Sequence, residues 1–180
     1  MSDSFIDPAK LIVRQTQNTA TEIAALVLPT VGSNRERHPK LQRFMLANDS
    51  VTVAVEVPVW LSAEEVRALQ ARCGICLSRG IECNNPVTGH IDFVQVRNGL
   101  VHILDYKPDA GTNRPVAQLT LYALALSYRT GIPLFDFKCA WFNEREYCEF
   151  SRARFSPRVP HPHPPWAGSR SSFPLAAAAC

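Results

Sequence analysis

The chain has 180 residues, of which 46% are hydrophobic and 19% are charged, so its length and composition are those of one folded domain with a sizeable core. The formal net charge is only +3, and Arg158 and Arg170 near the C-terminus leave +1 for residues 1–155. Bulk charge is therefore no argument for nucleic-acid binding, and the lack of an eighteen-residue apolar run excludes an ordinary transmembrane helix.

The start of the chain, Met1–Ser4, lacks the basic and apolar regions of a secretory signal peptide. The six cysteines do not have the spacing of a secreted disulfide framework. We therefore expect a cytoplasmic protein without a membrane partner.

Two helices are predicted in the first 50 residues. Apolar positions recur through Pro8–Leu28, and Pro29 would end this first helix. Arg35–Ala47 follows a Gly-Ser-Asn turn and has its apolar residues on one face. His38 lies at the start of this second helix, where a solvated histidine and a metal ligand are both compatible with the sequence.

A strand rich in valine is predicted at Val51–Trp60, interrupted by Glu56. Glu56 is either a structural carboxylate or one that faces a site. The next helix has a capping box, in which Ser62 caps the N-terminus and Glu65 occupies the third helical position.

Three cysteines follow this helix, at Cys73, Cys76 and Cys83. The first two have the spacing of metal ligands, and zinc would require a fourth ligand from elsewhere, such as Cys139, Cys148 or His90. An iron–sulfur cluster is the second option, and partly buried thiols without a metal are the third and simplest.

The most informative segment is a predicted hairpin over Thr88–Lys107. Asn98-Gly99 separates two apolar strands, which is a strong hairpin signal. Asp92 lies near the start of the first strand and Asp105 near the end of the second, so antiparallel pairing makes them neighbours. Lys107 is two residues beyond Asp105 and projects from the same face.

Two neighbouring carboxylates beside a predicted core repel each other unless a cation lies between them. Mg²⁺ and similar hard divalent ions prefer carboxylate, carbonyl and water oxygens. A lysine at this position could orient or accept a proton from a water molecule. Asp92, Asp105 and Lys107 are therefore candidate residues of a hydrolytic metal site.

After an Asp109–Arg114 loop, a helix is predicted over Pro115–Arg129, with Gln118 and Tyr122 stacked one turn apart. A buried strand over Leu134–Phe142 and a short edge strand over Glu146–Phe150 complete the predicted elements. Residues 156–180 contain six of the fourteen prolines, a composition that favours disorder. We therefore divide the chain into a folded domain, 1–155, and a Pro-rich tail, 156–180.

Three motifs in this order resemble the PD-(D/E)XK nuclease superfamily, and within it the RecB-like and lambda-exonuclease-like branch. They are Gly89-His90-Ile91-Asp92, Asp105-Tyr106-Lys107, and the Gln118-to-Tyr122 helix. The resemblance covers roughly residues 51–149. It implies an α/β fold with a restriction-endonuclease-like core, in which helices flank a central mixed β-sheet.

The resemblance also implies roles for individual residues. Asp92, Asp105 and the backbone carbonyl of Tyr106 would bind Mg²⁺ or Mn²⁺, and His38 and Glu56 are tentative further ligands. Lys107 would act on the attacking water. Gln118 would be an active-site helix residue that orients the DNA backbone or Lys107, and Tyr122 a tentative substrate contact.

The expected function is hydrolysis of DNA phosphodiesters, from an end or within a strand, in repair, recombination or replication. RNA is not excluded as a substrate, and a second copy of the chain or a partner protein could complete so small a core. Two alternatives are a non-catalytic module that keeps the fold and binds nucleic acid or protein, and a small interaction protein built on a cysteine-bound metal.

Overall fold

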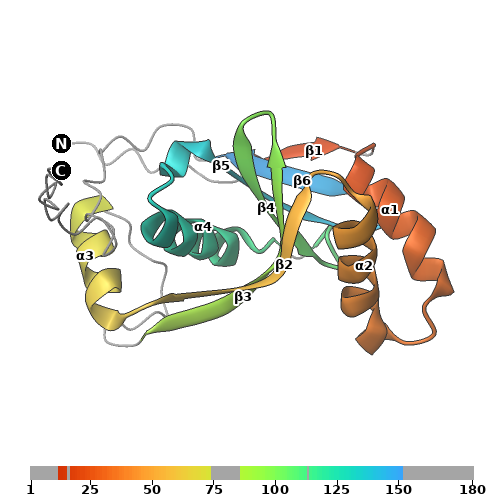
Figure 1. Cartoon of the computed structure of the whole chain (residues 1–180), viewed down its shortest axis with the longest axis horizontal. Coiled ribbons are helices and arrows are strands. Elements are labelled where there is room, and N and C mark those ends of the chain that lie inside the picture. The colour runs from red at the N-terminus through yellow and green to blue at the C-terminus, as the bar shows by residue number, and fades with distance from the viewer. Residues whose placement is uncertain (1–11, 16, 74–85, 113, 152–180) are drawn as a thin grey trace, which may run out of the picture.

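The computed structural model describes residues 12–15, 17–73, 86–112 and 114–151. These residues form an α/β fold with one six-stranded mixed sheet (Figure 1). The strands are β1 (Val13–Gln15), β2 (Thr52–Leu61), β3 (Val87–Arg97), β4 (Leu100–Tyr106), β5 (Phe137–Phe142) and β6 (Tyr147–Ser151). Their order is β1-β6-β5-β4-β3-β2, and only the β4–β5 pair is parallel. The prediction of a mixed sheet flanked by helices is confirmed.

The four α-helices are α1 (Thr19–Val27), α2 (Asn34–Asn48), α3 (Ala63–Cys73) and α4 (Val116–Thr130). Two short 3-10 helices are also present: η2 (Leu28–Thr30) lies between α1 and α2, and η3 (Leu134–Asp136) lies between α4 and β5. α4 connects β4 to its parallel neighbour β5, because a parallel pair needs a crossover. Among the described residues, no helix has both the length and the apolar character needed to cross a bilayer.

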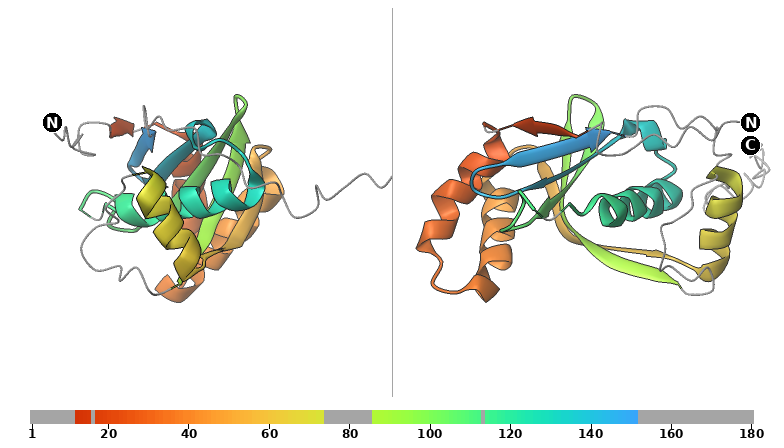
Figure 2. Two further views of the ribbon diagram at one scale, coloured as in Figure 1. Left: turned by 90° about the vertical axis from the view of Figure 1, so that its left-hand side faces the viewer. Right: turned by 180° about the vertical axis from the view of Figure 1, so that it is seen from behind.

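The sheet separates two hydrophobic cores. On one face, α1 and α2 pack Ala24, Leu41 and Met45 against Phe93 and Phe142. The other core includes Leu119 of α4 and Val66 of α3 (Figures 1 and 2). Each core removes large side chains from water, which provides the main driving force for folding.

The predicted hairpin is confirmed in detail. β3 and β4 pair from Phe93↔Leu104 to Arg97↔Leu100, and Asn98 and Gly99 form the turn with φ angles of 52° and 75°. Both angles are positive, as the favoured two-residue hairpin turn requires. The capping box of α3 is also confirmed, because the amide nitrogen of Glu65 lies 3.2 Å from Ser62 Oγ, and that of Ser62 lies 2.7 Å from Glu65 Oε2.

The residues of β3 that precede Phe93 no longer pair with β4, but they continue to pair with β2 as far as Val87↔Leu61. We call the two-stranded part made of Val57–Leu61 and Val87–Ile91 the distal ribbon. It runs past α4 towards α3 (Figures 1 and 2). Glu56, at the start of this departure, has a φ of 52°, which is unusual for a residue within a strand.

The predicted first helix, Pro8–Leu28, is wrong at Val13–Gln15, and residues 8–11 lie outside the described residues. Val13–Gln15 is a strand that pairs with β6, and the helix begins only at Thr19. Asn18 caps it, with Oδ1 accepting a hydrogen bond from the amide of Ala20 at 3.0 Å. A cap of this kind starts a helix, so the apolar residues before it are available for strand pairing. The same pairing corrects a second prediction, because β6 has neighbours on both sides and is not an edge strand.

The predicted strand Leu134–Phe142 begins three residues later than expected. Leu134–Asp136 forms η3, in which the amide of Asp136 donates to the carbonyl of Pro133 at 2.9 Å. Phe135 is consequently 76% exposed instead of buried. The predicted tail, 156–180, lies outside the described residues, so its disorder and the proposed domain division stay predictions.

Candidate active site

Asp92 and Asp105 lie at the fork where β3 separates from β4. The last recorded pair of the two strands is Phe93↔Leu104, so the next residues along each strand are these two aspartates. Asp92 Oδ2 accepts a hydrogen bond of 3.0 Å from the backbone amide of Tyr106. The fork therefore brings together the two carboxylates that antiparallel pairing predicts to be neighbours.

His38 reaches the same fork from α2. Its Nε2 lies 3.0 Å from the carbonyl oxygen of Tyr106 and 3.4 Å from Asp92 Oδ2. Its ring also packs edge-on against the ring of Tyr106, with 5.0 Å between the centroids. The structure thus joins His38 to Asp92 and to the carbonyl predicted as a metal ligand, although its side chain remains 40% exposed. Its role as a metal ligand stays a prediction.

Lys107 and Asp105 form an ion pair on the same side of β4. Lys107 Nζ lies 3.0 Å from Asp105 Oδ2, and their side chains are 24% and 6% exposed. Lys107 is thus the charged partner of this buried oxygen. Burial still has a cost, because it removes the water that would otherwise solvate the carboxylate, and the ion pair offsets only part of that cost.

The two aspartates have pKa values shifted in opposite directions. Burial, together with the charge of Asp92 and a hydrogen bond with it, raises the pKa of Asp105 to about 7, although Lys107 opposes the change. Burial also acts to raise the pKa of Asp92, but hydrogen bonds with His38, with Asp105 and with the Tyr106 amide outweigh it and hold this pKa below its usual value. The hydrogen bond to Asp92 in turn raises the pKa of His38. Without a cation, one carboxyl of the pair retains its proton near neutral pH.

The donor chemistry of this fork suits a hard divalent cation. Asp92, Asp105 and the Tyr106 carbonyl provide oxygen donors, which Mg²⁺ and Mn²⁺ prefer. In the described part of the chain, however, no group of three or more His, Cys, Asp or Glu side chains is arranged to hold a metal. The fit therefore depends on the two close carboxylates, of which Asp105 is buried, and on the main-chain carbonyl of Tyr106.

Glu56 lies next to this fork on β2. The pairs Val55↔Phe93 and Val57↔Ile91 flank Glu56 and Asp92, so the two residues are opposite each other on neighbouring strands. The side chain of Glu56 accepts a hydrogen bond from Gln42 of α2. The positive φ of Glu56 is a strained backbone conformation, and strained residues often cluster at functional sites. Direct participation of Glu56 in the aspartate cluster stays a prediction.

Gln118 and Tyr122 are joined to each other on α4. Gln118 Nε2 donates a hydrogen bond of 2.9 Å to Tyr122 Oη. Tyr122 packs directly over Gly89 of the distal ribbon, where an added Cβ would lie 2.4 Å from Tyr122 Cε1. The glycine of the Gly-x-x-Asp motif is therefore required for the close approach of α4 to β3.

Replacement of Gly89 by alanine is expected to displace the ring of Tyr122 and to destabilise the protein by about 1–3 kcal/mol. The reason is overpacking, because the new methyl group would overlap the phenol ring. Gly32→Ala is the matched control, since no atom lies within 4 Å of the Cβ added there. Urea denaturation of both variants measures the effect, and equal stabilities would contradict the close packing of Gly89 against Tyr122.

The predicted cysteine site receives no test from this structure. Cys76 and Cys83 lie outside the described residues, as does the side chain of Cys73. Two of the proposed fourth ligands, Cys139 and Cys148, are buried in the core of the α4 face. The third, His90, lies exposed on the distal ribbon.

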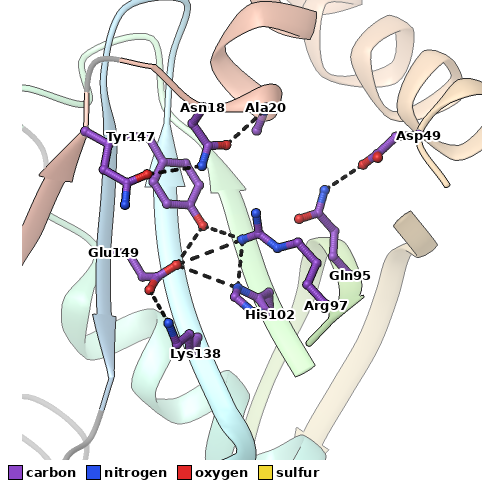
Figure 3. A network of polar contacts seen from close by, with 10 residues as sticks. Asn18, Ala20, Asp49, Gln95, Arg97, His102, Lys138, Tyr147 and Glu149 are labelled. Atoms are coloured by element: carbon purple, nitrogen blue, oxygen red, sulfur yellow. Dashed lines mark hydrogen bonds and ion pairs between the residues drawn. The ribbon is translucent and has the colours of Figure 1, made fainter. Parts of the chain in front are cut away.

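A polar network on β3 to β6 was not predicted from the sequence (Figure 3). Glu149 lies 2.7 Å from Lys138 Nζ, 3.1 Å from Tyr147 Oη, 3.7 Å from His102 Nδ1 and 3.9 Å from Arg97 Nη2. Burial and then the Arg97 charge lower the pKa of His102 to about 4, so this histidine is neutral. In this network, partly buried charges are paired with each other. Its members come from four neighbouring strands, and the sequence pattern of each strand does not say which other strands lie beside it.

Comparison of the sequence with protein-family models and with curated proteins finds no match. A function for this chain is therefore inferred from the residues of the site and from the motif resemblance.

Proposed function

We propose that this protein is a divalent-metal-dependent nuclease of the PD-(D/E)XK type, with a restriction-endonuclease-like core, that hydrolyses phosphodiester bonds of DNA in repair, recombination or replication. The observation that carries the proposal is the fork itself. Two carboxylates, a main-chain carbonyl, a lysine and a histidine meet where β3 leaves β4. Their order along the chain is that of the motif set.

Each residue of the fork has a role in this proposal. Asp92, Asp105 and the Tyr106 carbonyl would hold the metal ion, and His38 fixes Asp92 and the carbonyl in place. Bound Mg²⁺ or Mn²⁺ would supply positive charge to stabilise the phosphate and the leaving oxygen. Lys107, held by Asp105, would orient the attacking water or, in its neutral form, accept the proton of that water. The water oxygen forms the new bond to phosphorus as the bond to the leaving oxygen breaks.

A non-catalytic binding module is the second candidate. It is favoured by the hydrogen bond from His38 to the Tyr106 carbonyl, which satisfies a proposed ligand without a cation. The two adjacent carboxylates argue for catalysis, because a binder gains nothing from a buried pair of acidic side chains in which the pKa of one member is raised.

A gel assay with end-labelled single- and double-stranded DNA and RNA tests the proposal. Wild-type protein is expected to cleave in Mg²⁺ or Mn²⁺ but not in EDTA, and Asp105→Ala is expected to be inactive. Asp136→Ala, which removes a carboxylate on η3, is the matched control and should cleave normally. Absence of cleavage by folded wild-type protein under every condition would favour the binding module.

A further inference from the structure

The distal ribbon has an apolar face and an exposed face. Val59, Leu61 and Ile91 are buried in the core of the α4 face. The alternate residues Pro58, Trp60, Thr88 and His90 are exposed. The pairs Pro58↔His90 and Trp60↔Thr88 place these residues side by side on the two strands. A strand alternates its side chains between two faces, so these four share the face opposite the buried one.

Trp60 is the largest side chain on this face, and its orientation is fixed. The guanidinium of Arg129 lies 3.6 Å from the centroid of its ring. Arg129 is itself held by Glu65 Oε2 at 2.7 Å and by the Trp60 carbonyl at 3.3 Å. Although this cation covers one side of the indole, Trp60 remains 52% exposed. An aromatic ring that is both fixed and open to solvent loses little conformational entropy when a flat ligand stacks on it.

The exposed face leads directly to the candidate active site. Glu56 and Asp92 occupy the next opposed position on the ribbon after Pro58 and His90. Thr88 is four residues from Asp92, which corresponds to about 13 Å of extended strand. That separation suits a ligand that has one part at the aspartates and a flat group beside Trp60.

We propose that the Trp60 face of the distal ribbon binds unpaired bases of a single-stranded nucleic acid whose backbone enters the fork at Asp92 and Asp105. This inference rests on the proposed nuclease function and specifies its substrate as single-stranded or frayed ends. Unpaired bases expose their flat faces, whereas duplex bases are stacked on each other and cannot reach an indole on a strand. Because the net charge of the protein is only +3, its overall electrostatic attraction to the phosphate backbone is weak, and base stacking would contribute a larger share of the binding free energy.

The first experiment measures binding in EDTA, so that it does not depend on cleavage. Fluorescence anisotropy with labelled dT12 is expected to show affinity about 5- to 100-fold lower for Trp60→Ala than for wild type. Trp60→Phe keeps an aromatic face and should remain within about threefold of wild type. Phe135→Ala is the control, since it removes another exposed aromatic ring, on η3, and should bind as wild type does.

A second measurement needs no substitution on the ribbon. In a Trp166→Phe variant, the remaining tryptophans are Trp60 and Trp141, and Trp141 is only 1% exposed. Addition of dT12 is expected to quench the Trp60 fluorescence to saturation, and a blunt duplex of equal length should quench it much less. Unchanged affinity in folded Trp60→Ala, or no quenching, would overturn the proposal.

The outcomes separate this inference from the nuclease assignment. Binding that depends on Trp60, without cleavage in Mg²⁺ or Mn²⁺, would support the ribbon surface and contradict the catalytic role. Cleavage of single-stranded DNA with the same KM in wild type and Trp60→Ala would support the nuclease and overturn the ribbon proposal.

Discussion

Lys107→Ala is expected to lower the rate of DNA cleavage at least about 100-fold, because the variant loses the group that orients or deprotonates the attacking water. The fold should tolerate the change. Lys107 is itself partly exposed, and Asp105, which loses its charged partner, can retain a proton near neutral pH instead of a buried charge. DNA binding in EDTA should change little, since the phosphate contacts of one lysine are a small part of an interface.

Lys138→Ala is the matched control for this variant. Like Lys107, Lys138 is a partly exposed lysine paired with one carboxylate: it lies in β5, 2.7 Å from Glu149 Oε1, and its side chain is 33% exposed. It belongs to the polar network of Figure 3 and not to the fork. Single-turnover cleavage rates at saturating protein measure the chemical step for both variants. Equal rates for Lys107→Ala and Lys138→Ala would remove Lys107 from the proposed mechanism.

Local sequence signals predicted those parts of the fold that depend on neighbouring residues. Asn98-Gly99 specifies a hairpin because both residues tolerate positive φ, and Ser62 with Glu65 specifies a helix start. The strand β1 could not be predicted in this way. Three residues form a stable strand only when another strand is already present, and β1 depends on β6, more than a hundred residues away.

The same distinction applies to the candidate site. Antiparallel pairing across a short turn makes Asp92 and Asp105 neighbours, so their proximity follows from sequence spacing. The position of His38 depends instead on how α2 packs against the sheet, and the sequence suggested it only through the family resemblance. The strained backbone of Glu56 and the packing of Tyr122 on Gly89 are tertiary features without a local signal.

Asp105→Asn is expected to make the metal-free protein more stable at pH 8, by roughly 2–4 kcal/mol. In the folded protein the pKa of Asp105 is about 7, whereas an unfolded aspartate has a pKa near 3.8. Between these values the folded state holds a proton that the unfolded state releases. The contribution of Asp105 to the stability of the wild type is therefore greatest below about pH 4, and it is lost as the pH rises towards 7. Asparagine cannot ionise, so the variant avoids this loss.

Urea denaturation in EDTA from pH 5 to pH 8 measures this effect, and Glu149→Gln provides a control of opposite sign. Burial acts to raise the pKa of Glu149, but the hydrogen bond from Lys138 holds it below the usual value, so its charge stabilises the fold at neutral pH. Glu149→Gln should therefore be less stable than wild type at pH 8. Parallel pH curves for Asp105→Asn and wild type would contradict the raised pKa of Asp105.

Addition of Mg²⁺ or Mn²⁺ extends the same experiment to the proposed metal site. A cation that binds only the folded wild type stabilises it by an amount that grows with the logarithm of its concentration. Asp105→Asn lacks one of the two carboxylates and should gain far less. The two curves should therefore converge at pH 8 as the metal concentration rises, because the ion compensates the charge that the substitution removes. Equal stabilisation of both proteins would show that the metal binds elsewhere. Asp105 would then have no role in metal binding, even if the protein cleaves DNA.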